Sequence, residues 1–301
     1  MRKRRHRSRA GVGAVLAAVL LGTAACDASG GSSSGPEATE AKSRPTVKPT
    51  PTPAWDTTPE SLAAVGDSIT RGFDACQVLS DCPEVSWATG SDASVDSLAV
   101  RLLGASGAVE RSWNYAVTGA RMADLPSQMA RAATRRPELV TVMIGANDAC
   151  RATVDAMTPV ADFRADFEDA MASLRDALPK TQVFVASVPD LKRLWSEGRT
   201  NPVGKQVWKL GICPSMLAEP DVMTAAATER RDAVQDRVEA YNDVLRDVCA
   251  KDRYCRYDGD AVFDYRFGQK QLSQWDWFHP SVDGQARLAE IAYRVVSGKG
   301  V

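Results

Sequence analysis

Four short apolar runs, each flanked by amphipathic stretches, dominate the chain from about residue 57 onward. They read SLAAVG, RSWNYAV, ELVTVMIG and TQVFVASVP. The runs lack the strict alternation of polar and apolar residues that is typical of a sheet with one solvent-exposed face. They therefore predict strands that are covered on both faces of the sheet. Strands that alternate with helices assemble into parallel sheets. The sequence therefore predicts an α/β domain with helices on both faces of a parallel sheet.

Three stretches carry the apolar spacing of amphipathic helices, with apolar residues recurring every three or four positions. They are residues 160–178, residues 221–250 and the C-terminal VDGQARLAEIAYRVVS. Residues 190–220 are rich in Trp, Gly and Pro and predict an excursion over the surface of the domain. No internal repeat is present in the sequence.

The N-terminus carries an export signal. A basic block, RKRRHRSR, precedes an apolar run from Ala10 to Leu21 and then the small residues of LGTAAC. This order predicts a signal peptide over 1–25, and the apolar run is too short for a stable membrane span. LGTAAC resembles a bacterial lipobox, which implies lipidation of Cys26 and a membrane-anchored lipoprotein on the outer face of the cell membrane. The alternative is simple release as a secreted protein, and twin-arginine export stays open.

Residues 26–56 are Ser/Gly-rich and then Pro/Thr-rich, with almost nothing to bury. Such a segment does not recover the entropy lost on ordering, so we expect a disordered tether. This leaves 57–301 as the folded domain. Lys and Arg number 37 against 38 Asp and Glu, a formal net charge of −1, which gives no reason to expect a nucleic-acid partner. The sequence implies no obligate protein partner.

Six cysteines remain after Cys26, and an even number in an exported chain predicts three disulfides. Fifteen pairings are possible. Closure of short loops favours two of the pairs, which leaves the third as a longer link: Cys76–Cys82, Cys249–Cys255 and Cys150–Cys213. Zinc binding is the alternative, but the spacings do not suit it and no histidine lies near these cysteines.

Glycine-bearing polar turns follow three of the apolar runs. Gly66-Asp-Ser68 follows the first, Thr118-Gly119 the second and Gly145-Ala-Asn147 the third. The carboxyl ends of parallel strands meet at one edge of a sheet, so we expect these turns to lie along one rim.

A serine hydroxyl becomes a nucleophile when a base and an orienting group stand beside it. His6 leaves with the signal peptide, so His279 is the one imidazole of the mature protein. Asp276 lies three residues upstream, where one turn brings its carboxylate to the ring. These residues predict Ser68 as nucleophile, His279 as base and Asp276 as its partner. The alternatives are a Ser68 that caps a helix and a His279 packed in a loop.

The oxyanion of an acyl-transfer intermediate needs hydrogen-bond donors. The amide N–H of Ser68, the amide N–H of Gly119 and the side-chain amide of Asn147 are the candidates. Taken singly, Gly119 and Asn147 are better explained as ordinary turn residues. Their joint occurrence after successive strands favours the oxyanion role.

The sequence blocks VGDSITRGFD, NYAVTGAR, IGANDAC and DWFHPSVDGQ resemble, in order and context, the four blocks of the SGNH (GDSL-type) hydrolases. The resemblance implies a flavodoxin-like three-layer α/β/α sandwich, a Ser-His-Asp triad of Ser68, His279 and Asp276, and the oxyanion hole named above. It implies no metal or organic cofactor. SWATGS, GANDAC and CPSML are similar to the phospholipase B-like branch, which implies a Cys150–Cys213 bond.

We therefore expect an extracellular esterase or lipase that hydrolyses lipid acyl or phospholipid esters through an acyl-enzyme. One alternative is a carbohydrate O-acetyl esterase with a shallower pocket, and another is a tethered binding lipoprotein without activity. A set of large apolar residues in 190–220 is a candidate lining for an acyl groove: Trp195, Trp208, Met216 and Leu217.

Overall fold

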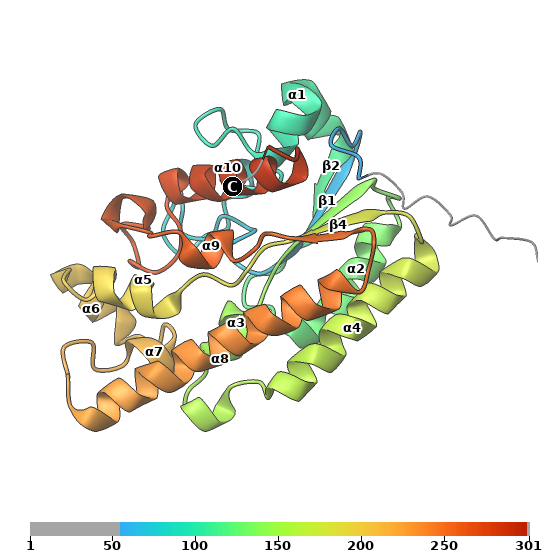
Figure 1. Ribbon diagram of the computed structural model, residues 1–301. Helices are drawn as coiled ribbons and strands as arrows, with labels where there is room; N and C mark the ends of the chain where they lie inside the picture. Colours follow the sequence, from blue (N-terminus) through green and yellow to red (C-terminus); the bar gives the residue numbers. More distant parts are fainter. Residues whose placement is uncertain (1–54, 300–301) are drawn as a thin grey trace, which may run out of the picture. The chain divides into compact units, whose positions relative to one another are not determined.

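The computed structural model describes residues 55–299 (Figure 1). The predicted signal peptide, Cys26 and nearly all of the predicted tether lie outside the described residues. Trp55 and Asp56, which we assigned to the tether, are bonded to the domain: Trp55 Nε1 donates to the Val296 carbonyl at 2.9 Å, and the Asp56 amide donates to Gln182 at 2.6 Å. The folded part therefore includes both residues.

The sheet has five parallel strands in the order β2-β1-β3-β4-β5. Every residue of β1, β3 and β4 is buried, because helices cover both faces. The strands are β1 Leu62–Gly66, β2 Ser112–Asn114, β3 Leu139–Met143, β4 Gln182–Val185 and β5 Cys255–Tyr257.

Helices form a layer on each side of this sheet. In Figure 1, α1 and α10 lie together on one side, and on the other side α4 packs between α2 and α8. The predicted α/β/α sandwich is confirmed, and the strand order is that of the flavodoxin-like folds. The helices are α1 Leu98–Arg111, α2 Leu125–Ala133, α3 Ala146–Ala149, α4 Val160–Ala177, α5 Leu191–Gly198, α6 Pro202–Trp208, α7 Pro214–Leu217, α8 Ala225–Ala250, α9 Ala261–Asp264 and α10 Val282–Val296.

The three predicted helices correspond to α4, α8 and α10. Two of them have side-chain caps: the hydroxyl of Thr224 accepts the Ala227 amide at the start of α8, and that of Ser281 accepts the Gly284 amide at the start of α10. The apolar stripes face the core, as the spacing predicts, and the buried residues of α4 are Phe163, Phe167, Ala170, Met171 and Leu174.

Two features differ from the sequence expectations. Strand β5 was not predicted, because a three-residue edge strand reading CRY has neither the length nor the hydrophobicity of the other runs. The expected surface excursion at 190–220 instead folds into α5, α6 and α7 and packs onto the domain core.

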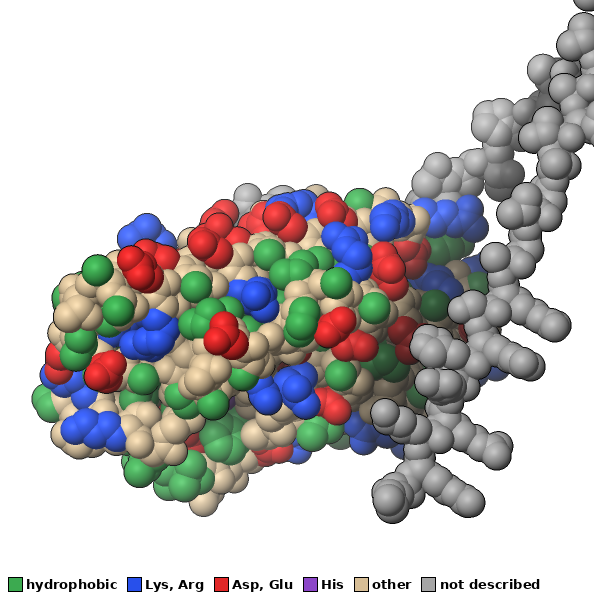
Figure 2. Space-filling model, turned by 90° about the horizontal axis from the view of Figure 1, so that it is seen from below, with side chains coloured by type: hydrophobic (Ala, Val, Ile, Leu, Met, Phe, Trp, Pro, Cys, Tyr) green, Lys and Arg blue, Asp and Glu red, His purple; other side chains and the backbone are tan. Residues whose placement is uncertain are grey.

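The face that carries α4 and α8 mixes charges of both signs (Figure 2). Ion pairs join the two helices, at 3.1 Å between Arg164 and Asp247 and at 3.4 Å between Lys251 and Glu168. Each such surface pair adds at most about 1 kcal/mol. None of the helices within residues 55–299 combines the length and hydropathy that a membrane span requires.

Candidate active site

The turn after β1 places Ser68 at the carboxyl edge of the sheet. Gly66 has φ +149°, and a Cβ there would lie 2.2 Å from the Met143 carbonyl oxygen of β3, so only glycine fits. The side chain of Gln128, on α2, holds both backbone groups of Gly66: it accepts from the amide at 2.7 Å and donates to the carbonyl at 2.9 Å. No helix begins at Ser68 within the described residues, so the capping interpretation of this serine is wrong.

Ser68, His279 and Asp276 form a continuous hydrogen-bonded chain. Ser68 Oγ lies 2.9 Å from Nε2 of His279, and His279 Nδ1 lies 2.5 Å from Oδ2 of Asp276. The other oxygen of Asp276 accepts the amides of Phe278 and His279 at 2.9 and 3.0 Å. The carboxylate is therefore fixed in orientation and aligns the ring with the serine hydroxyl.

The helices of 191–217 brace the segment that carries His279. Trp208 Nε1 donates to the Asp276 carbonyl at 2.7 Å. Gly204 packs against the ring of Trp277, where a Cβ would lie 2.9 Å from Cγ of that ring. Trp277 itself adopts φ +54°, a left-handed conformation that this packing supports. The tryptophan-rich segment 190–220 therefore packs against the backbone next to His279 and holds it in place.

Three hydrogen-bond donors lie on the same rim. Within residues 55–299, neither the Ser68 amide nor the Gly119 amide has a protein acceptor. Gly119 has φ +83°, and a Cβ built there would meet open space. Asn147 donates one amide hydrogen to the Ala120 carbonyl at 3.0 Å, which leaves its second hydrogen for another acceptor.

Burial and charge set the ionisation of these groups. Burial of the His279 ring opposes its charged form, but the Asp276 carboxylate outweighs this and raises the pKa of His279 above its usual value. Burial likewise opposes the charged form of Asp276, yet its bonds to His279 and the two amides hold its pKa below the usual range. Burial raises the pKa of Asp67, beside the serine, to about 7.

Sequence reasoning missed several residues that hold the rim segments together. Gln285, on α10, accepts the Trp87 amide at 2.9 Å and donates to the Ile69 carbonyl at 2.8 Å. Asp148 accepts the Met122 amide at 2.9 Å and the Thr158 hydroxyl at 2.7 Å. Both residues stand in sequence blocks quoted above. The identity of a glutamine or an aspartate does not reveal its hydrogen-bond partner, which for Gln285 lies 216 residues away.

A pocket of about 250 Å³ opens beside the serine. Its polar members are Ser68, Asn147 and His279, and nearly all the rest of its wall is apolar. The four residues predicted as an acyl-groove lining are not part of it: Trp195, Trp208, Met216 and Leu217 are buried in the core instead. That prediction is wrong, because these large side chains anchor α5 to α7. The apolar wall is formed by others, chiefly Ile69, Leu191, Leu194, Ile212, Phe267, Leu272 and Phe278.

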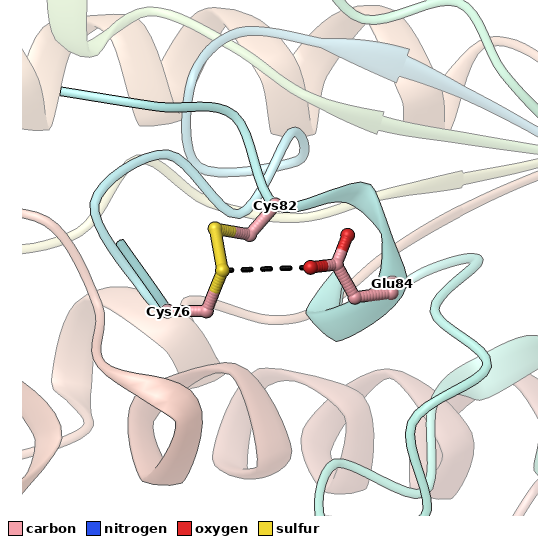
Figure 3. Close-up of side chains that lie close together, drawn as sticks. All are labelled: Cys76, Cys82 and Glu84. Carbon is pink, nitrogen blue, oxygen red and sulfur yellow. Dashed lines mark hydrogen bonds between the residues drawn. A yellow bond between two sulfur atoms is a disulfide. The ribbon is translucent and has the colours of Figure 1, made fainter. Parts of the chain in front are cut away.

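The structure joins the six described cysteines in the pairing that short loop closure favours: Cys76–Cys82, Cys150–Cys213 and Cys249–Cys255. A sulfur in a disulfide is no thiolate ligand, so the zinc alternative is wrong for these cysteines. Figure 3 shows the Glu84 carboxylate pointing toward the Cys76–Cys82 disulfide. Its Oε1 atom lies 3.4 Å from Cys76 Sγ. A disulfide sulfur has no proton to donate, so we interpret this approach as a packing contact.

Comparison with solved structures gives distant likenesses. A family two carbohydrate esterase from Clostridium thermocellum, solved with cellohexaose, is 14% identical with a TM-score of 0.48; the match covers 79% of this chain and 64% of that one, less than two thirds of its length. An extracellular lipase from Streptomyces rimosus is 17% identical with a TM-score of 0.41, covering 80% and 99%. A GDSL-like lipase described from Parabacteroides merdae is 16% identical with a TM-score of 0.44, covering 82% and 99%.

A search of curated proteins by sequence found no match. The model of one protein family, described as GDSL-like lipase/acylhydrolase, matches residues 62–292. This range contains all of the strands described above and every residue of the candidate site. The chain therefore belongs to the GDSL-like lipase/acylhydrolase family and is a carboxylic ester hydrolase.

Proposed function

We propose that this hydrolase is an extracellular serine esterase that cleaves esters of medium-length acyl chains, in lipids or related molecules. The observation that carries the proposal is that Ser68, His279 and Asn147 line one pocket whose wall is otherwise largely apolar. An apolar wall favours an aliphatic acyl group, because each methylene moved out of water contributes roughly 0.8 kcal/mol of binding free energy.

In this mechanism Ser68 is the nucleophile, His279 the base and Asp276 its orienting partner. Ser68 Oγ attacks the acyl carbonyl carbon while its proton passes to His279 Nε2. The oxyanion accepts hydrogen bonds from the amides of Ser68 and Gly119 and from the free amide hydrogen of Asn147. His279 then gives its proton to the leaving alcohol, and an acyl-enzyme remains on Ser68.

Hydrolysis of the acyl-enzyme repeats these steps with water. His279 takes a proton from the water as its oxygen attacks the ester carbon, and returns that proton to Ser68 Oγ as the acid leaves.

The size of the pocket limits the acyl group. The pocket of about 250 Å³ has room for an acyl group much larger than acetyl. An acetyl group would leave most of this apolar wall without contact. The pocket thus favours the lipid or carboxyl-ester function over a carbohydrate O-acetyl esterase.

We also propose export. Three disulfides are typical of proteins that fold in an oxidising compartment. The basic, apolar and small-residue order of the N-terminus supports a signal peptide, and LGTAAC supports lipidation at Cys26 with anchoring to the membrane. The phospholipase B-like motifs support a phospholipid as one class of ester substrate.

The test is a chain-length profile on p-nitrophenyl esters from two to sixteen carbons. We expect kcat/KM to peak at intermediate length and to vanish in Ser68→Ala. Ile212→Trp, which fills the pocket, should move the peak to shorter chains. Leu210→Trp is the matched control, because that side chain is 84% exposed and lies outside the pocket wall.

Two results would count against the proposal. A peak at two carbons that Ile212→Trp leaves unchanged supports the acetyl esterase. Absence of turnover at every chain length supports the binding lipoprotein.

A further inference from the structure

A second buried carboxyl group lies against the proposed triad. Asp74 is 1% exposed, and a carboxylate oxygen of Asp74, one of Asp276 and a ring nitrogen of His279 all lie within 4.8 Å of one another. Asp74 is 202 residues from Asp276 in the sequence. It belongs to the loop after the Ser68 turn, and no role in the mechanism above uses it.

The backbone around Asp74 is tightly fixed. Asp74 has φ +56°, its amide donates to the Ser80 carbonyl at 3.0 Å, and its carbonyl accepts the Ser273 hydroxyl at 2.6 Å. Its side chain accepts the Leu79 amide within the loop that the Cys76–Cys82 disulfide closes. Ser273 lies three residues before Asp276, so these bonds hold the two carboxyl groups against each other.

This arrangement is unfavourable in the resting site. Two buried carboxylates this close repel each other. Burial, and then the Asp276 charge, raise the pKa of Asp74 to about 6. The charged groups that face Asp74 are Asp276 and His279, and the carboxyl group of Asp67 faces His279 as well. Arg71 of the same loop does not relieve the repulsion, because it pairs with Asp81 at 3.0 Å.

The arrangement becomes favourable when His279 is positively charged. During attack, the proton of Ser68 Oγ passes to Nε2, and the ring becomes a cation flanked by both carboxylates. An interaction that is stronger in the transition state than in the ground state accelerates the reaction. The repulsion between Asp74 and Asp276 is then offset only as the reaction proceeds.

We propose that Asp74 is a positioning residue of the active site, which supplies a second negative charge to stabilise the imidazolium ion that His279 forms. The proposal rests on the proposed function of Ser68 and His279. Asp74 acts through His279 and touches neither the substrate nor the attacking oxygen.

The test compares Asp74→Asn with the wild type in the pH dependence of kcat/KM and kcat. Asparagine keeps the bond from the Leu79 amide and removes only the charge. Loss of that charge lowers the pKa of His279, so the acid limb should move to lower pH by about one unit. The plateau kcat should fall by up to about tenfold, because one pKa unit corresponds to a factor of ten.

Asp258→Asn is the matched control. Asp258 is buried as well, but its carboxylate accepts the Ser187 amide at 3.0 Å and lies outside the candidate site. We expect this variant to lower stability and to leave the acid limb where it is.

An acid limb that does not move in Asp74→Asn overturns the inference and leaves Asp74 as a loop anchor. This outcome is distinct from failure of the proposed function, in which the wild type has no esterase activity or Ser68→Ala retains it. Asp74→Ala is a second variant for the same test. Its acid limb should move as far as that of Asp74→Asn, and its stability should fall further than that of Asp74→Asn.

Discussion

Replacing Asp276 with Asn should nearly abolish activity while leaving the fold in place. In the wild type, Oδ1 accepts two backbone amides and Oδ2 accepts the Nδ1 hydrogen of His279. An asparagine that keeps its oxygen toward the two amides must point its NH₂ group at Nδ1. A ring that accepts there carries its proton on Nε2, the atom that must accept the proton of Ser68.

The opposite rotamer does not help. It turns the NH₂ group toward the amides of Phe278 and His279, so that donors face donors at 2.9 and 3.0 Å. At a 1%-exposed site water does not relieve this, and each unpaired buried group costs about 1–3 kcal/mol. The first rotamer therefore prevails, with the ring in the wrong tautomer. The corresponding change in a serine protease lowers kcat by about 10⁴, and we expect a loss on the order of 10³–10⁴ here.

The assay is kcat and KM on the best p-nitrophenyl ester, with circular dichroism to confirm folding. We expect KM to change little, because Asp276 is not among the residues that line the pocket. A folded Asp276→Asn enzyme with kcat within tenfold of the wild type would refute the proposed geometry.

The pH dependence of the activity is a second measurement of the role of Asp276. The active form needs neutral His279, and its pKa is raised by Asp276 despite burial. Activity should therefore be full above that raised pKa and fall as the pH drops through it, with a midpoint above the unperturbed value of about 6.5. In Asp276→Asn the residual activity should persist to lower pH, since the charge that raised the pKa is gone.

Two further predictions concern single interactions around the pocket. Asn147→Ala removes one oxyanion donor and should lower kcat by about 10²–10³ with normal folding; an unchanged kcat in steady-state assays would remove Asn147 from the oxyanion hole. Replacing Cys150 and Cys213 together with Ser should lower the free energy of unfolding by about 4 kcal/mol, because that bond closes a loop of sequence separation 63. Since both cysteines line the pocket, activity on longer acyl chains should fall further than on acetyl esters; denaturant unfolding and the chain-length profile check both statements.

The candidate site was readable in the sequence because few residues were available for its chemistry. The sequence has two histidines, and His279 is the one that lies in the predicted folded domain, with Asp276 three residues upstream. Ser68, Gly119 and Asn147 each follow an apolar run, and parallel strands bring such turns to one edge. In the structure, Ser68 follows β1 and Asn147 follows β3, the neighbouring strand, so local pattern and topology agree.

The groups that support the site were not readable, because their roles depend on long-range contacts. Gln128 and Gln285 stand in helices at positions that sequence alone assigns to solvent, yet both are buried against backbone groups of the Ser68 turn. Asp74 is an ordinary loop aspartate until the fold brings Asp276 to it. Large apolar residues such as Trp208 gave a misleading signal, since hydrophobicity alone does not separate a pocket wall from a core.

The most direct test of the account is covalent labelling with a fluorophosphonate, followed by peptide mass mapping. The account predicts a single adduct on Ser68, lost in Ser68→Ala and formed far more slowly in His279→Ala, because the hydroxyl reacts only with its base in place. A folded, disulfide-bonded wild type that forms no adduct, or forms it on another residue, would contradict the assignment of Ser68 as the nucleophile.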